Sequence, residues 1–299
     1  MTFPRRFNLA PLACFVLVSL STLFVNVPAR AGDAHWSGFY IGGNAGYGFG
    51  SASNSLGIVD GALTKCHFCD NTIGGGPTID HLIAQSAGSP ELKPHGFSGG
   101  LQLGYNWQAA NWVYGLEVEA GALHQRDNNG NSFGLIGNTA LGPLGGGVCG
   151  TTGLESCIGS YSTKVSADWL FSLRPRLGYS FDNTLVYGTA GVAVTRLKFE
   201  QTYGDNITYP LVAGSTGAGG SVYSSAQAWR AGWVLGGGIE QALHEHWSLK
   251  AEYLYMRFAG VNAAGHLTDG FGSFADFSNS VNHFSSNLVR VGLNYKFGG

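Results

Sequence analysis

The stretch Asn287–Phe297, NLVRVGLNYKF, alternates along its length between two kinds of residue. Every second position is apolar, and the positions between are mostly polar or small. Because successive side chains of a β-strand point to opposite faces, this pattern predicts a strand with one apolar and one polar face. The apolar face comprises Val289, Val291, Leu293, Tyr295 and Phe297.

The same alternation recurs in seven earlier segments. They are Trp36–Gly50, Gly96–Trp107, Trp112–Leu123, Thr163–Phe181, Thr184–Phe199, Ala228–Gln241 and Trp247–Phe258. Short turns near 109–111, 182–183 and 244–246 alternate with long connections, about Ser51–His95, Gln125–Tyr161, Gln201–Ser225 and Ala259–Phe284. This layout is typical of bacterial outer-membrane barrels. We therefore predict an all-β fold, an eight-stranded antiparallel up-and-down transmembrane β-barrel with four long extracellular loops.

The first 31 residues have the features of an export signal. Arg5 and Arg6 precede the apolar run Leu12–Val27, and Ala29-Arg30-Ala31 forms a small-x-small cleavage site. Cys14 stands at the start of the apolar run rather than after it, which argues against a lipid anchor. We expect residues 1–31 to be a cleaved signal peptide and residues 32–299 to form a barrel in the cell outer membrane.

Composition agrees with a wall that faces lipid. Charged residues make up 11% of the chain, against about 25% in a typical soluble domain, while aromatic residues reach 13%. The formal net charge of −2 argues against nucleic acid as a partner.

Aromatic residues gather at the short-turn ends of the predicted strands, as expected of a girdle at a membrane interface. They are Trp36, Trp107, Trp112, Tyr179, Phe181, Trp247 and Phe297. A soluble β-sandwich is the alternative, but it gives no reason for aromatic residues to collect at one end.

In the predicted registers, charged mid-strand residues share the inner face. They are Glu117, Glu119, Asp168, Arg174, Arg176, Arg230, Glu240, Lys250, Glu252 and Arg290, five acids and five bases. The interior of an eight-stranded barrel is just wide enough for side chains to fill. We expect a plug of ion pairs in which Glu117 and Glu119 pair with Arg174 and Arg176. The alternative is a narrow conduction path through these charges.

Four cysteines follow the signal: Cys66, Cys69, Cys149 and Cys157. An even number in an exported chain predicts disulfides, and the simplest pairing is Cys66–Cys69 with Cys149–Cys157. Pairing between the loops, or zinc or thiol redox chemistry at Cys66-His67-Phe68-Cys69, remains an alternative. No metal or other cofactor is otherwise indicated.

His283 stands close to Ser285, and a histidine beside a hydroxyl at the outer rim could hydrolyse lipid A. No carboxylate nearby in the sequence is placed to orient the histidine, so we expect no enzymatic activity.

Three segments together resemble the small opacity-like outer-membrane proteins of alphaproteobacteria, also labelled outer-membrane immunogenic or porin-family proteins. They are Trp36–Gly48 (WSGFYIGGNAGYG), Arg174–Tyr179 (RPRLGY) and Val289–Phe297 (VRVGLNYKF). The resemblance implies an eight-stranded barrel with a role in envelope integrity or host contact, and it carries no catalytic residues. It also implies that the barrel-assembly machinery reads the C-terminal aromatic residue, although here Gly298 and Gly299 follow Phe297. We expect a structural, surface-presenting protein whose loops meet host or envelope ligands. The alternative is a narrow porin-like channel for small solutes.

Overall fold

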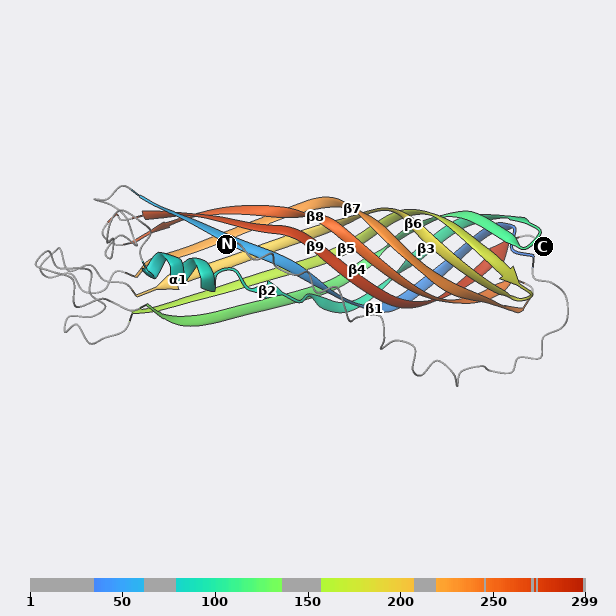
Figure 1. The fold of residues 1–299 in the computed structure, drawn as a ribbon, viewed down its shortest axis with the longest axis horizontal. Helices are drawn as coiled ribbons and strands as arrows, with labels where there is room; N and C mark the ends of the chain where they lie inside the picture. Colours follow the sequence, from blue (N-terminus) through green and yellow to red (C-terminus); the bar gives the residue numbers. More distant parts are fainter. Residues whose placement is uncertain are drawn as a thin grey trace, which may run out of the picture. The chain divides into compact units, whose positions relative to one another are not determined.

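A computed structural model describes residues 35–61, 79–135, 157–206, 219–244, 246–269, 272 and 274–297. Figure 1 shows long, tilted strands that wind around one axis. The strands are β1 (Gly38–Asp60), β2 (Glu91–Leu92), β3 (His95–Ala109), β4 (Trp112–Leu135), β5 (Cys157–Phe181), β6 (Thr184–Asp205), β7 (Ser221–His244), β8 (Trp247–Thr268) and β9 (Phe274–Phe297). One helix, α1 (Ile79–Ala87), lies between β1 and β2 in the described sequence. No helix in these ranges is long and apolar enough to cross a bilayer.

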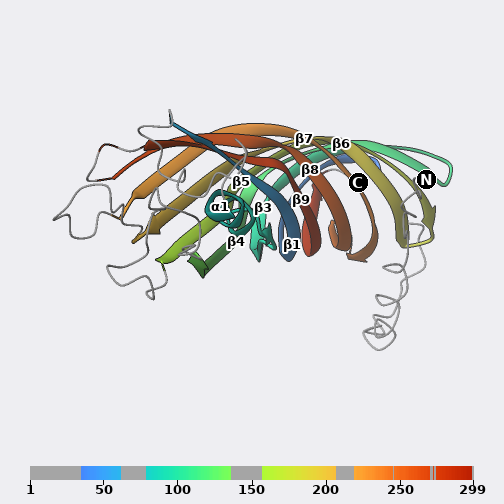
Figure 2. The same ribbon diagram turned by 60° about the vertical axis from the view of Figure 1, so that its left-hand side comes forward.

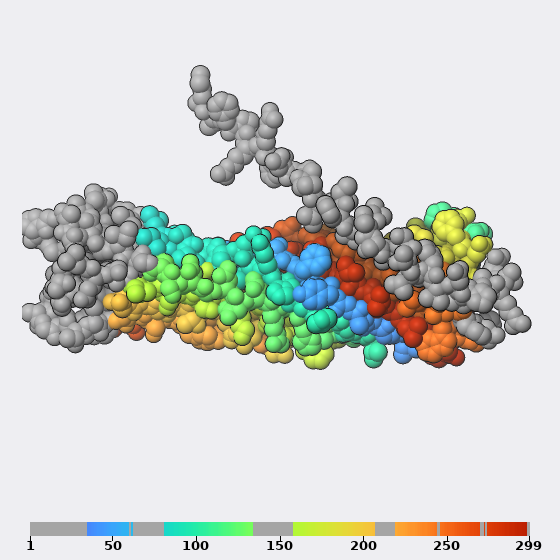
Figure 3. Space-filling model, turned by 90° about the horizontal axis from the view of Figure 1, so that it is seen from below, coloured from blue at the N-terminus to red at the C-terminus, as the bar shows by residue number. Residues whose placement is uncertain are grey.

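The strands close into a ring of eight, as predicted. Each of β3 to β8 pairs antiparallel with the next strand, and β1 pairs with both β3 and β9. In Figure 3, β1 in blue lies directly against β9 in red. The two-residue strand β2 pairs with β1 through Ala52 and Leu92, just beyond the pair Phe49 and His95 of β3. It therefore extends the row of β3 and adds no further strand to the ring.

Tight turns join β3 to β4, β5 to β6 and β7 to β8 at one rim. The pair Phe39 and Phe297 brings the start of β1 and the end of β9 to the same rim. Ala110 and Asp182 stand in these turns at φ 52° and 51°, in the left-handed region. L-residues occupy that region at a cost, and Asp is found there more often than Ala. We call this rim the turn end.

The strands are longer than predicted, and this corrects the bounds of the long connections. Strands β1 and β4 to β9 contain 22 to 25 residues, whereas about 9–11 suffice to cross a membrane. Much of each segment assigned to a loop is therefore strand. The predicted strands were too short because, in the part of each strand far from the turn end, the inner face is apolar and the outer face is polar. In the part of β9 that precedes Asn287, Phe277 and Val281 point inward, whereas Asp276 and Ser278 point outward.

A bulge in β5 corrects the predicted register of its first half. The pairing of β5 with β6 shifts between Ala167 and Leu170. Val165 and Ala167 were expected on the lipid face but are fully buried inside, and Lys164 points outward. An extra residue in one strand exchanges its two faces, because side-chain direction alternates with a period of two. Strict alternation could not reveal this shift.

The outer wall near the turn end is apolar and lies between two belts of exposed aromatic residues. The belt at the turn end includes Trp107, Trp112, Phe181, Trp247 and Phe297. The second belt, farther from that end, includes Phe49, Phe97, Trp169 and Trp229. Aromatic belts at both interfaces are characteristic of transmembrane barrels. They place the membrane around the half of the barrel that carries the turn end.

Trp36 does not belong to the first belt, contrary to the prediction. It is 5% exposed, and its Nε1 donates to Ser180 Oγ over 2.8 Å inside the turn end. It packs there in a small cluster with Val113, Leu185 and Tyr187. The residue precedes β1, so it can fold under the rim and cover the mouth of the barrel.

Helix α1 occupies a place in the wall where strand pairing stops. The pairing of β3 with β4 ends at His95 and Arg126, while β1 and β4 continue beyond it. Figure 2 views α1 nearly end-on beside β1 and β4. Ala84 packs against inward residues of the strands, and the carbonyl of Gly88, just after the helix, accepts from Asn54 and Gln201. The helix thus fills the gap between the two strand edges.

Candidate functional site: an ion-pair network across the lumen

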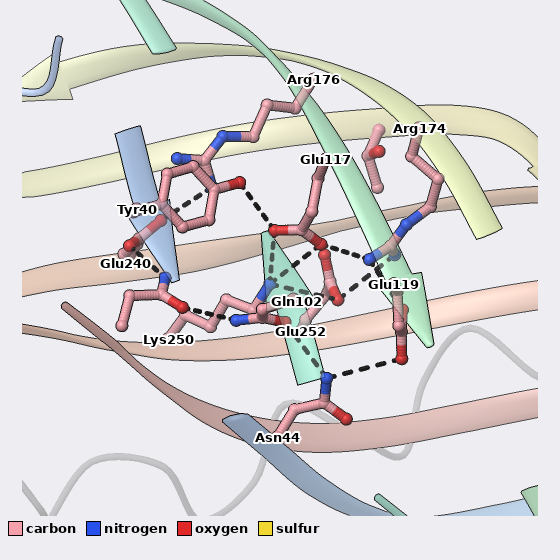
Figure 4. A network of polar contacts seen from close by, with 12 residues as sticks. Tyr40, Asn44, Gln102, Glu117, Glu119, Arg174, Arg176, Glu240, Lys250 and Glu252 are labelled. Atoms are coloured by element: carbon pink, nitrogen blue, oxygen red, sulfur yellow. Dashed lines mark hydrogen bonds and ion pairs between the residues drawn. The ribbon is translucent and has the colours of Figure 1, made fainter. Parts of the chain in front are cut away.

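Charged side chains from five strands meet inside the membrane-embedded half of the barrel (Figure 4). The strands β4, β5, β7, β8 and β9 place them there because each of these side chains falls on an inward position. The group consists of Glu117, Glu119, Arg174, Arg176, Glu240, Lys250, Glu252 and Arg290, all at most 4% exposed. Four carboxylates face four cations, so the set is formally neutral.

Arg174 stands at the centre of this network. It lies directly opposite Glu117 in the register of β4 and β5, and its Nη2 pairs with Glu117 Oε1. The same Nη2 lies 3.1 Å from Glu119 Oε2, and Nη1 lies 3.4 Å from Glu252 Oε2. One guanidinium therefore joins carboxylates of β4 and β8 on opposite sides of the lumen. The fork of a guanidinium suits such multiple pairing.

Arg290 and Lys250 complete the pairing of the same carboxylates. Arg290 Nη1 pairs with Glu119, and its Nε donates to Glu252 Oε2 over 2.7 Å. Lys250 Nζ lies 2.9 Å from Glu117 Oε2. Every carboxylate in this part of the network thus contacts at least two cations. This matters because a buried charge without a partner is costly.

Arg176 belongs to a second part of the network. Arg176 was predicted to pair with Glu117 or Glu119. Instead, its Nη1 pairs with Glu240 Oε2 at 2.9 Å. Its guanidinium lies between two rings, 4.7 Å from the centre of Tyr40 and 5.2 Å from that of Tyr187. Such cation–π contacts gain strength where water is excluded.

Polar neutral side chains connect the two parts. Tyr40 donates to Glu117 over 2.8 Å, and Tyr187 donates to Glu252 over 3.0 Å. Asn294 Nδ2 donates to Glu240 over 2.7 Å, while its Oδ1 accepts from Gln102 over 2.5 Å. The sequence analysis missed these residues. The alternation predicts that these side chains face the lumen. It does not show which of them hydrogen-bond to a charged group and which only fill space.

Two predicted members, Asp168 and Arg230, lie outside the network. Asp168 sits in the bulge of β5 and reaches the outer wall, 3.6 Å from Arg126. Arg230 does face inward, but it is ten residues from Glu240 along β7, roughly 33 Å at about 3.3 Å per residue. No ion pair is found for Arg230 among the described residues. The bulge of β5 therefore excludes Asp168 from the network, and the distance along β7 excludes Arg230.

A second, apolar layer fills the lumen beyond the network. Its members are buried and come from strands all around the ring; they include Leu123, Leu197, Phe199, Met256, Phe258 and Phe284. The lumen is therefore filled first by paired charges and then by hydrocarbon.

The remaining predicted site residues have different outcomes. Cys66, Cys69 and Cys149 lie outside the described residues, as does the side chain of Cys157 at the start of β5. The Nδ1 of His283 lies 3.1 Å from Ser53 Oγ, whereas Ser285 is bonded to Ser51. The histidine thus has a hydroxyl partner on β1, not the serine that follows it in sequence. In the described ranges, no group of three or more His, Cys, Asp or Glu residues could hold a metal ion.

A closed strand ring with a lipid-facing band, aromatic belts and a filled polar lumen defines a small transmembrane β-barrel of the bacterial outer membrane. The chain belongs to the family described as outer membrane protein beta-barrel domain, whose model matches residues 15–297. This confirms the resemblance drawn from the three short segments and places the protein in the outer membrane.

Two relatives matched by sequence agree with this assignment. A 31 kDa outer-membrane immunogenic protein of Brucella melitensis is 34% identical over 88% of this chain and 84% of its own length. A 22 kDa outer membrane protein of Rhizobium leguminosarum is 24% identical over 68% of this chain and 67% of its own length. The solved structure of the outer membrane protein OprG of Pseudomonas aeruginosa covers 88% of this chain and 99% of its own, with 12% identity and a TM-score of 0.35.

Proposed function

We propose that this protein is a closed, non-catalytic barrel that contributes to envelope integrity and presents its long loops at the cell surface. The observation that carries the proposal is the network around Arg174, in which buried cations and carboxylates from opposite walls pair across the lumen. To conduct, the barrel would have to separate these pairs, and leaving a buried charge without its partner typically costs about 3–5 kcal/mol.

The apolar layer beyond the network supports the same conclusion. An ion that passed the charges would next meet Phe258, Phe284 and their neighbours, which bury their side chains against each other. Hydrocarbon offers no ligand for a hydrated ion, and moving a bare charge into it is very unfavourable. The two layers block the lumen by different physical means, so a change in one leaves the other in place.

The length of the strands supports presentation at the surface. About ten residues per strand suffice for the membrane, so the remainder of a strand such as β5, with 25 residues, extends the wall into water. The far ends of these strands then stand away from the lipid surface, where a host or envelope ligand can reach them. The relatives named immunogenic in Brucella are consistent with such exposure.

Assembly and maturation complete the proposal. Residues 1–31 would be removed after export, and the barrel-assembly machinery would recognise β9, whose last described residue is the exposed Phe297. Disulfide Cys66–Cys69 would stabilise the connection that follows β1, and Cys149–Cys157 the connection that leads into β5.

Conductance across a planar lipid bilayer tests the closed lumen. Purified, folded protein should produce no steady current steps above leak, while a general porin added to the same bilayer should produce them. Steady steps that disappear in the Arg174→Gln or Arg176→Gln variant would instead support the narrow channel. A deletion strain should admit large antibiotics and detergents more readily, and the intact gene should restore the barrier.

A further inference from the structure

The outer wall just beyond the second aromatic belt concentrates four cations on one side of the barrel. These residues point outward from three adjacent strands, which lie side by side in Figure 3. We call them the basic patch: Arg126 on β4, Lys164 on β5, and Arg196 and Lys198 on β6. They are not part of the lumen network.

Strand register brings the four cations together. Arg126 is paired with Ser166, and Ser166 with Lys198, so the two cations stand in one row across three strands. At about 4.8 Å per strand, their backbones are roughly 10 Å apart. Lys164 lies in the neighbouring row, and Arg196 lies opposite the bulge of β5. A single acidic group could therefore touch several of these side chains.

The acids within the patch do not neutralise it. Asp168 lies 3.6 Å from Arg126, and Glu200 lies 2.7 Å from Lys198 and 3.8 Å from Lys164. Four cations against these two carboxylates leave a formal charge of +2. The hydrogen bond from Lys198 lowers the pKa of Glu200 and raises that of the lysine, so both stay charged near neutral pH.

The patch lies at the level of the membrane surface. Trp169 adjoins it in the bulge of β5, and Trp229 lies opposite Arg196 on β7; both rings are about half exposed to the outside. Exposed Trp rings mark the headgroup level of a bilayer. The side chains of Arg126 and Lys164 are 62% and 53% exposed and so can reach a headgroup beside the wall.

The opposite side of the barrel has a different surface at this height. There β1 and β9 present hydroxyls that bond to each other: Ser51 with Ser285, and Ser55 with Ser280. A general solubilising surface would carry charge all round. At this height β8 adds one outward cation, Arg257, opposite Ser285. The concentration of four cations on three adjacent strands indicates a ligand with a fixed place on the wall.

We propose that the basic patch binds the phosphorylated headgroup of a glycolipid in the outer leaflet. Cations near a membrane surface attract anionic lipid, and two or more of these side chains can surround one phosphate by charge-assisted hydrogen bonds. The position beside the aromatic belt, away from the loop-bearing end, assigns the phosphate to a lipid neighbour. The inference goes beyond the proposed structural role and does not depend on whether the lumen conducts.

Native mass spectrometry of the detergent-solubilised full barrel can test this site. Diphosphorylated lipid A is titrated into the wild type and into the double variant Lys164→Gln/Arg196→Gln. The double variant should bind roughly tenfold or more weakly, as expected for two cations near an anionic headgroup. The matched control, Arg257→Gln/Lys296→Gln, removes two cations outside the patch, one on β8 and one at the turn end, and should bind like the wild type. Glu200→Gln should bind several-fold more tightly, a gain that a misfolded barrel cannot produce.

Three results would overturn the proposal. Equal weakening in both double variants would show a non-local charge effect. Equal affinity for dephosphorylated lipid A would show that the patch does not recognise the phosphate. Displacement of lipid A by millimolar inorganic phosphate would show that the site takes the free ion.

Discussion

Arg174 on β5 and Glu117 on β4 occupy directly opposed positions, and both side chains are buried, at 0% and 4% exposure. The pair lies deep in the barrel, where neither charge has water as an alternative partner. Arg174 also lies within 3.4 Å of Glu252 on the far wall. The stability of the barrel is therefore coupled to this one guanidinium.

Replacing Arg174 by Met should destabilise the barrel by about 3–5 kcal/mol, because Glu117 and Glu119 lose a buried partner. Urea unfolding in lipid vesicles, followed by tryptophan fluorescence, measures the change. Arg126→Met is the matched control: its pair with Asp168 lies on the surface, and exposed pairs contribute only about 0–1 kcal/mol. Equal losses in both variants would contradict a network held by buried charges.

Replacing Trp36 by Phe should cost about 1 kcal/mol, since the ring stays buried but the hydrogen bond to Ser180 is lost. Trp36→Ala should cost about 3–5 kcal/mol, because it also leaves a cavity in the mouth of the barrel. The thermal shift of the folded band on a heat-modifiability gel reports both. Trp112→Phe, at an exposed position, serves as control, and a similar effect there would argue against a specific role for Trp36.

Ala110→Gly should stabilise the barrel by up to about 1 kcal/mol. Ala110 has φ 52°, a conformation that costs an L-residue about 1–2 kcal/mol, and glycine's greater freedom in the unfolded chain offsets part of the gain. The adjacent Ala109→Gly lies within β3 and should not stabilise. The same unfolding measurement distinguishes the two, and an unchanged or lower stability for Ala110→Gly would refute the idea of strain in this turn.

Spin labels should find two environments along β9. A label at Val291, which is 58% exposed to the outside, should collide readily with oxygen and poorly with a water-soluble nickel chelate. A label at Ser278, outward on the far half of the strand, should show the reverse. Oxygen-rich surroundings at Ser278 would mean that the membrane covers more of the barrel than its aromatic belts indicate.

The halves of the strands at the turn end could be predicted from the sequence because they lie in the bilayer, which imposes a simple rule. Any side chain on the outer face must be apolar, so Val289, Val291 and Leu293 stand out at a period of two. The far halves escaped detection because their outer face meets water. Ser278 outside and Phe277 inside repeat the alternation with the polarity reversed, and a search for lipid-facing residues passes over it.

The amino-acid sequence by itself determined the strand ring, its short turns and the inward direction of every predicted lumen charge except Asp168, because each follows from the alternation of neighbouring residues. Only the tertiary structure decided which charges meet. A bulge moves Asp168 to the outer wall, and Arg230 lies too far along β7 to reach the network. The stagger of β7 against β5 places Glu240 beside Arg176, so Arg176 pairs with Glu240 rather than with Glu117. Partners in a closed barrel lie across the lumen on strands far apart in the chain, and only the closure of the ring fixes their heights relative to one another.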